Sequence, residues 1–325
     1  MRYRLVVFAM ICASERLLSQ SPNIGPPPGK LVDIGGRKLH LLCSGPTTSG
    51  GAVAPTVVLE AGASAFSIDW TLVQREVARA NRVCSYDRAG SAWSDPSTPP
   101  GDASVARDLH SLLQAAGERP PYIMVGASLG GMFVRLYQAD YPNEVAGLVL
   151  VDPATEDRLF TYFEGKAVLI GSLTAEQMRS TVPQRAVAVP RRKPQTGAPF
   201  DKLPAELYDL RIKLDAKLIA SIPDTVSPEF IAAFREAERA RLTRLLALRS
   251  KEEHPLGDRP IVVLSRGVES SAEMQAVHAG IARLSTNSRH SVIAGSGHEI
   301  HLFEPSAVIR AITDVLTAVR EKSRL

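Results

Sequence analysis

The sequence predicts an α/β fold, in which a mostly parallel β-sheet is flanked by helices and interrupted by a helical insertion. From residue 30 onward, short apolar runs alternate with amphipathic helical patterns, which is typical of parallel strands joined by helices. One of these apolar runs leads directly into a serine that lies among glycines. About 100 residues in the second half of the chain show helical patterns but no buried strand.

The elements of the predicted core can be assigned in chain order. Strands buried on both faces read as short, continuous apolar runs, and a pair of glycines between two such runs indicates a hairpin. The first half contains a hairpin at 30–45, strands at 55–62, 82–87 and 122–126, and helices at 67–80, 104–117 and 129–141. The second half contains strands at 145–152, 260–265 and 289–296, and helices at 271–284 and 305–322.

Residues 155–255 interrupt this alternation and divide the core into 30–154 and 256–325. Their clearest helix begins after Ser227, a favoured N-cap residue, with Pro228 at its first position. Ligands bind beyond the carboxyl ends of the strands in open α/β sheets. We therefore expect the insertion to form a helical cap over that edge. The alternative is a separate helical domain that packs elsewhere.

The composition favours neither a nucleic-acid-binding protein nor a metal protein. The 325 residues carry a net charge of +4, and the densest basic run, 191–193, lies between prolines in an expected loop. The three cysteines show neither a CxxC motif nor the Cys/His spacing of a zinc site. We therefore expect no nucleic-acid partner and no bound metal.

Residues 1–29 read as a signal-like segment followed by a proline-rich linker. Two arginines precede the apolar run at 5–13, which fits the hydrophobic region of a signal peptide but is too short to span a bilayer, which takes about 20 residues. Export is one expectation, and a cytoplasmic location is the alternative.

Cys43 and Cys84 fall on expected strands. A disulfide between them would favour an oxidising compartment, whereas two unrelated buried thiols would not.

The stretch GASLGG at 126–131 indicates a nucleophilic serine. It matches G-x-S-x-G and lies in the strand–turn–helix context that this motif requires. Glycines before and after Ser128 permit the sharp turn that exposes its hydroxyl. The backbone N–H of Leu129, at the start of the helix, can then face a developing oxyanion.

A serine hydroxyl needs a base, and His298 is the preferred candidate. It follows the last strand in a glycine-rich loop that can carry a side chain back across the sheet edge. His301, three residues later, is the rival and is expected to begin the next helical turn as a packing residue. The acid that orients the histidine is expected to be Asp152, which ends the strand after the serine's helix. Glu269, which follows the next strand, is the alternative.

Five motifs in order and spacing resemble the α/β-hydrolase superfamily over about residues 30–322: LEAG, YDRAGSAWSD, GASLGG, VLVDPA and GSGHEIHLFEP. The match resembles the capped branch of small serine esterases and lipase-like enzymes. This resemblance implies an eight-stranded sheet with the cap inserted after the sixth strand, a Ser-acid-His triad and no cofactor. Some members of that branch carry the acid at the position of Asp152. The resemblance also implies that Gly62 or Ala63 supplies a second oxyanion N–H.

Two positions depart from the pattern of the superfamily. Ala127 stands where histidine is frequent, and the sequence from Glu60 to Ala63 replaces a frequent His-Gly. The nucleophile is serine, whereas haloalkane dehalogenases and related epoxide hydrolases use aspartate, so their chemistries are not expected.

The sequence therefore predicts hydrolysis of a carboxylic ester or related acyl bond in a small-molecule substrate, through an acyl-enzyme. The alternatives are an acyltransferase with the same triad, an amide-cleaving peptidase, and a non-catalytic small-molecule receptor. Cap side chains select the substrate through pocket shape, which residue identities do not define. Neither the acyl chain length nor the oligomeric state follows from the sequence.

Overall fold

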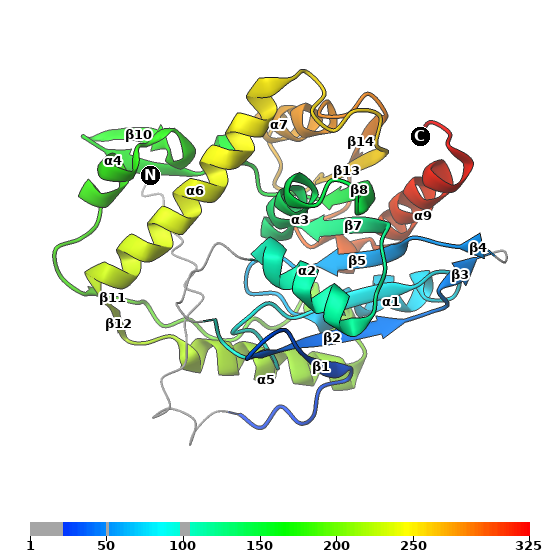
Figure 1. Ribbon diagram of the computed structural model, residues 1–325. Coiled ribbons are helices and arrows are strands. Elements are labelled where there is room, and N and C mark those ends of the chain that lie inside the picture. The colour runs from blue at the N-terminus through cyan, green and yellow to red at the C-terminus, as the bar shows by residue number, and fades with distance from the viewer. Residues whose placement is uncertain (1–21, 50–51, 98–104) are drawn as a thin grey trace.

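The computed structural model describes residues 22–49, 52–97 and 105–325, so the signal-like run at 5–13 lies outside the described residues. At its centre is one eight-stranded sheet in the order β1-β2-β6-β5-β7-β8-β13-β14 (Figure 1). The strands are β1 (Lys30–Asp33), β2 (Lys38–Ser44), β5 (Thr56–Glu60), β6 (Val83–Tyr86), β7 (Tyr122–Ala127), β8 (Val145–Val151), β13 (Ile261–Arg266) and β14 (Ser288–Ile293). In this sheet the β1–β2 and β2–β6 pairs are antiparallel. Every other neighbouring pair in the order given, from β6–β5 to β13–β14, is parallel. The predicted fold class is confirmed.

Helices cover both faces of this sheet. They are η2 (Ser67–Trp70), α1 (Thr71–Val77), α2 (Val105–Ala116), α3 (Leu129–Asp140), α7 (Ala272–Ala282), α8 (Ile300–Phe303) and α9 (Pro305–Glu321). Side chains alternate along β7, so the strand contacts helices on both faces of the sheet. Met124 packs with residues of α2, α3 and α7, whereas Ile123 and Val125 pack with residues of α1 and α9. A strand that is buried on both faces must be apolar throughout, as the sequence of β7 is.

The insertion follows β8, the sixth strand of the main sheet along the chain. It contains η3 (Glu156–Arg158), β9 (Phe160–Phe163), β10 (Lys166–Leu169), η4 (Ile170–Ser172), α4 (Ala175–Ser180), β11 (Val187–Ala188), η5 (Phe200–Lys202), α5 (Ala205–Ser221), β12 (Thr225–Val226) and α6 (Pro228–Lys251). The oxygen of Ser227 caps α6 by accepting the N–H of Phe230 at 3.2 Å. Two short antiparallel pairs, β9–β10 and β11–β12, were not predicted. Phe160 and Tyr162 of β9 are exposed, so the strand lacks the pattern of a buried one.

The insertion packs on the side of the sheet where β5 ends, at the left of Figure 1. Arg211 of α5 is buried and donates to Asp69 of η2 at 3.2 Å, while its guanidinium lies 3.5 Å from the ring centroid of Phe200. At the start of the insertion, Glu156 of η3 accepts two hydrogen bonds of 2.8 Å from Arg135 of α3. These buried charge pairs fix the insertion on the core. A further hairpin, β3 (Thr48–Ser49) with β4 (Ala52–Val53), lies at the opposite side (Figure 1).

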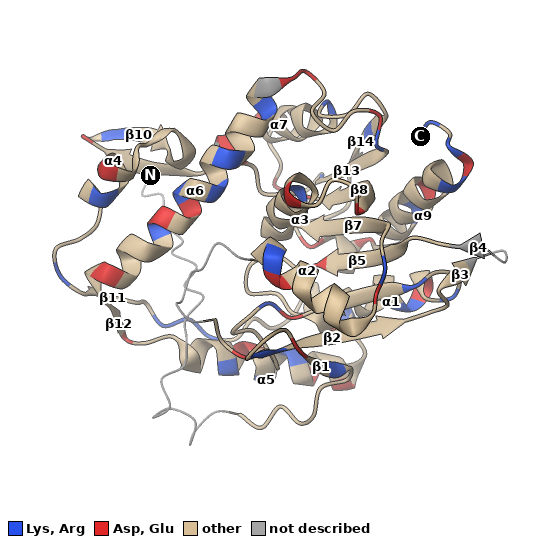
Figure 2. Cartoon of the chain, viewed as in Figure 1, with Lys and Arg blue, Asp and Glu red and all other residues tan. Residues whose placement is uncertain are grey.

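Charged residues of both signs are interleaved along α6, as Figure 2 shows. Arg239 pairs with Glu236 of the same helix at 2.6 Å, and Arg244 pairs with Asp140 of α3. The basic run at 191–193 is likewise partly neutralised, because Arg191 pairs with Asp224 and Arg192 with Asp215. Within the described residues, these arginines bind acidic side chains of the protein itself.

Candidate active site

Ser128 stands on a sharp turn between β7 and α3. Its backbone has φ 51° and ψ −120°, a conformation that is costly for a residue with a side chain and that is found at functional sites. Its carbonyl accepts the N–H groups of Gly131 and Ala154, both at 2.9 Å, and its own N–H donates to Val151 at 3.0 Å. These bonds on both sides of the residue hold the turn in place.

The flanking glycines are required by close backbone contacts. A Cβ on Gly126 would lie 2.5 Å from the carbonyl oxygen of Gly130, and a Cβ on Gly130 would lie 2.4 Å from that of Glu60. A Cβ on Gly62 would lie 3.3 Å from the Cβ of Ser128, so the loop after β5 passes directly beside the serine. Side chains at these positions would push the turn and the loop apart.

Asp152 and His298 meet at the same edge of the sheet. Asp152 follows β8 with φ 41°, His298 follows β14, and the Nδ1 atom of His298 lies 2.5 Å from Oδ2 of Asp152. The other carboxylate oxygen accepts the backbone N–H of Arg266 at 3.0 Å. Burial favours a raised pKa for Asp152, but the hydrogen bonds from His298 and Arg266 and their positive charge outweigh burial. The pKa therefore lies below its ordinary value.

The two rival residues lie in different surroundings. Glu269 is exposed on the loop after β13, whereas the hydrogen bond of His298 goes to Asp152. His301 lies on α8 and is buried, with its ring centroid 4.5 Å from that of Trp70. Burial, together with the charges of His298 and Arg211, lowers the pKa of His301 to about 3, so its ring is neutral at ordinary pH. This is the packing role that the sequence predicted for His301.

A buried ion pair holds the loop that follows β5. Arg88 donates to the Glu60 carboxylate at 2.5 Å and to the carbonyl oxygens of Ala61 and Gly62, both at 2.6 Å. The hydroxyl of Tyr86 donates to the second oxygen of Glu60. Burial raises the pKa of Glu60 even beside the Arg88 guanidinium. The arginine thus fixes both backbone carbonyls of the loop that carries Gly62 and Ala63.

Leu129 begins α3, and its N–H is the first of those that lack an i−4 carbonyl partner within the helix. Leu129 follows Ser128 directly, and Gly62 lies beside Ser128 across the loop contact. Together with Ala63, these residues are the candidate donors for an oxyanion. The charged contact between Glu60 and Arg88 is the feature that sequence reasoning missed here, because it joins residues 28 positions apart.

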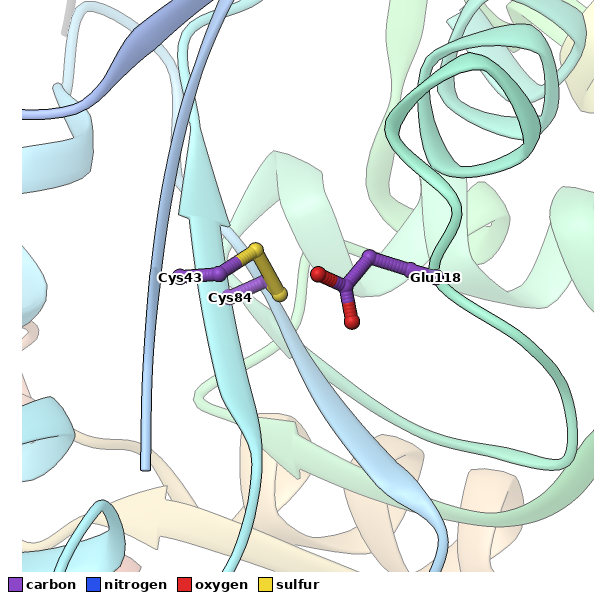
Figure 3. Close-up of side chains that lie close together, drawn as sticks. All are labelled: Cys43, Cys84 and Glu118. Atoms are coloured by element: carbon purple, nitrogen blue, oxygen red, sulfur yellow. A yellow bond between two sulfur atoms is a disulfide. The ribbon is translucent and has the colours of Figure 1, made fainter. Parts of the chain in front are cut away.

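One group of potential metal ligands contains Cys43, Cys84 and Glu118, shown in Figure 3. The two cysteines are paired across β2 and β6 and joined as a disulfide. Disulfide sulfurs are not thiolates, which are the form that binds metals. Glu118 accepts two hydrogen bonds from Arg82, at 2.6 and 3.2 Å. Because its donor atoms are engaged in this way, the group does not fit a metal ion.

Comparisons with known proteins place this fold in a family. A family model described as alpha/beta hydrolase fold matches residues 55–305. The chain therefore belongs to the α/β-hydrolase family and has a hydrolase fold. The solved structure of a thermophilic esterase from Thermogutta terrifontis superposes with a TM-score of 0.56 at 19% identity, covering 89% of this chain and 98% of that one. At this identity the likeness shows the fold alone.

Two curated relatives differ in how much of their length is matched. The YqjL protein of Bacillus subtilis strain 168 is 25% identical over 279 residues, which cover 84% of this chain and 88% of that protein. The efuK protein of Hormonema carpetanum, named as a probable transporter, is 37% identical over 137 residues. Those residues cover 41% of this chain but only 19% of the relative. Among the helices that the structure describes, none is both long and apolar enough to cross a membrane.

Proposed function

We propose that this protein is a serine hydrolase that cleaves a carboxylic ester or related acyl bond of a small molecule. In this proposal Ser128 is the nucleophile, His298 the base and Asp152 the acid. The observation that carries it is the 2.5 Å contact between His298 and Asp152, at the sheet edge where Ser128 stands on its strained turn. The family and the esterase neighbour agree with this chemistry.

The proposed reaction follows from the orientation of the imidazole. Because Nδ1 of His298 faces Asp152, Nε2 is the nitrogen that takes the hydroxyl proton of Ser128. The Ser128 oxygen bonds to the acyl carbon of the substrate, and the electron pair of the substrate C=O bond moves onto the carbonyl oxygen. The N–H of Leu129, with that of Gly62 or Ala63, stabilises this oxyanion. As the oxyanion collapses, the bond between the acyl carbon and the alkoxy oxygen breaks, and His298 gives its proton to the departing alcohol. Water then attacks the acyl-enzyme with His298 as its base, and the proton returns to Oγ of Ser128 as the free acid leaves.

The lowered pKa of Asp152 supports its proposed role. A carboxylate that stays ionised keeps the proton of His298 on Nδ1 and stabilises the imidazolium formed during attack. The exposed carboxylate of Glu269 has no such contact with the imidazole in this arrangement.

Labelling with a fluorophosphonate tests the proposal directly. We expect one equivalent to react rapidly with the wild-type protein, and none with Ser128→Ala, because only an activated serine attacks such a reagent at a useful rate. Mass spectrometry of the intact protein measures the adduct, and Ser172→Ala, which removes an exposed serine of η4 in the proposed cap, is the control. An unlabelled wild-type protein would reject the hydrolase function and favour a non-catalytic receptor.

Product analysis separates the remaining reactions. The same triad in an acyltransferase would pass the acyl group to an alcohol, so we would add acceptor alcohols to p-nitrophenyl esters of graded chain length and identify the acyl product. Free acid as the main product supports hydrolysis, and an exchanged ester supports acyl transfer. Turnover of a p-nitroanilide would support the amide-cleaving alternative.

We also propose that the protein acts in an oxidising compartment, after export. The Cys43–Cys84 disulfide and the apolar run at 5–13 support this location. Protein isolated from its native host and alkylated without reductant is expected to gain two alkyl groups fewer than after reduction, by intact mass. Equal alkylation in both samples would show two free thiols and contradict the proposal.

A further inference from the structure

We propose that His278 is a positioning residue for Asp152, and that Ser265, together with the carbonyl of Pro153, keeps its ring in the tautomer that this role needs. This inference rests on the proposed function, because it concerns the acid of the proposed triad. His278 lies on α7 and is 2% exposed, and Ser265 lies within β13 and is fully buried. Neither belongs to a recognised motif.

The hydrogen bonds of His278 define which ring nitrogen carries the proton. Its Nε2 lies 2.9 Å from the carbonyl oxygen of Pro153, which can only accept, so Nε2 is the protonated nitrogen. Its Nδ1 lies 2.7 Å from Oγ of Ser265. In a neutral ring Nδ1 is the acceptor, so the Ser265 hydroxyl donates to it.

The chain of bonds continues to the next strand. Oγ of Ser265 also lies 2.7 Å from Nε2 of His290 on β14. Because the serine hydrogen is committed to His278, its oxygen accepts from His290. The chain therefore has one direction, from His290 through Ser265 and His278 to the carbonyl of Pro153. Burial lowers the pKa of His290, which favours its neutral form and keeps the chain free of charge.

This chain ends on the residue that follows the triad acid. Asp152 has φ 41°, so its turn needs contacts that hold it in place. Its N–H donates to Leu264 at 2.7 Å and its side chain accepts from Arg266, both on or beside β13. The bond from His278 to Pro153 holds the other side of the same turn. All three contacts hold the carboxylate where it meets His298.

His278 and Arg266 both lie near the Asp152 carboxylate, in addition to His298. Nδ1 of His278 lies 3.9 Å from Oδ1 of Asp152, too far for a hydrogen bond, and Nε of Arg266 lies 3.6 Å from Oδ2. A second cation next to Asp152 would compete with the imidazolium of His298 for its charge. The proposal therefore assigns His278 a neutral ring, which holds the turn without this competition.

Three variants, assayed with a p-nitrophenyl ester, test the proposal. His278→Leu removes the donor to Pro153, and we expect kcat to fall on the order of 10²-fold, as for misplaced catalytic groups, with KM nearly unchanged. His278→Gln should retain most of kcat, because its amide N–H can replace Nε2–H. Ser265→Ala should lower kcat, because Nδ1 of His278 loses its donor and the carbonyl of Pro153 alone then selects the tautomer. His110→Leu, on α2, is the control for loss of a partly buried histidine.

A double variant makes the test independent of whether His278→Leu folds. A glutamine amide has no tautomer to select, so adding Ser265→Ala to His278→Gln should leave kcat at the value of His278→Gln alone. An equal loss from Ser265→Ala in both backgrounds would overturn the proposal, as would a His278→Leu protein with wild-type kcat. An inactive, unlabelled wild-type protein would instead overturn the proposed function, which separates the two failures.

Discussion

Replacing Asp152 with asparagine is expected to lower kcat by about 10⁴-fold, the scale of losing the triad acid in a serine hydrolase. The hydrogen bonds of the site explain why the isosteric change is so severe. The N–H of Arg266 donates to one oxygen of Asp152, so the asparagine oxygen must occupy that position. Its NH₂ group then faces Nδ1 of His298, which must become an acceptor. The imidazole proton moves to Nε2, where the base should have its lone pair.

The matched control for this prediction is Glu269→Gln. Glu269 is the alternative acid, lies exposed after the neighbouring strand, and has φ 52°, a backbone angle similar to that of Asp152. We expect kcat and KM of this variant to remain close to wild type with a p-nitrophenyl ester. A severe loss in Glu269→Gln together with a mild one in Asp152→Asn would assign the acid to Glu269 and reject the proposed triad.

The fold could be predicted because its signals are local. The buried strands are continuous apolar runs, as in β7 and β8, and the turn at Ser128 has a steric requirement that glycine meets at 126 and 130. The two short strand pairs of the insertion were missed because they are mostly exposed and carry no such run. The sequence therefore specifies the sheet better than the insertion at 155–255.

The contacts that hold the candidate site could not be predicted from the sequence. The pairing of Arg88 with Glu60 and of Arg211 with Asp69 joins residues 28 and 142 positions apart, and only the folded chain brings them together. Ser265 looks like an ordinary strand residue, and His278 like an ordinary histidine on a helix. Their roles depend on the tautomer that their neighbours impose, which has no signature in the spacing of residues.

Replacing Arg88 with methionine is expected to destabilise the protein by about 3–5 kcal/mol, the scale of breaking a buried ion pair on one side. The arginine side chain is only 5% exposed and pairs with Glu60, which is 1% exposed. Its loss leaves that carboxylate buried without a cation and leaves the carbonyl oxygens of Ala61 and Gly62 without their donor. Because this loop lies beside Ser128, kcat should fall as well. Urea unfolding measures the stability change.

The exposed pair of Arg79 and Glu76 provides the control, because it is also a single arginine–glutamate contact, at 2.9 Å. Arg79→Met should change the free energy of unfolding by less than about 1 kcal/mol, since water and salt screen such a pair. If Arg88→Met matched this small change, the buried pair would not stabilise the loop. Adding Glu60→Gln to Arg88→Met should recover part of the stability but not kcat. The double variant removes the uncompensated carboxylate, whereas the two backbone carbonyls that position Gly62 still lack the arginine.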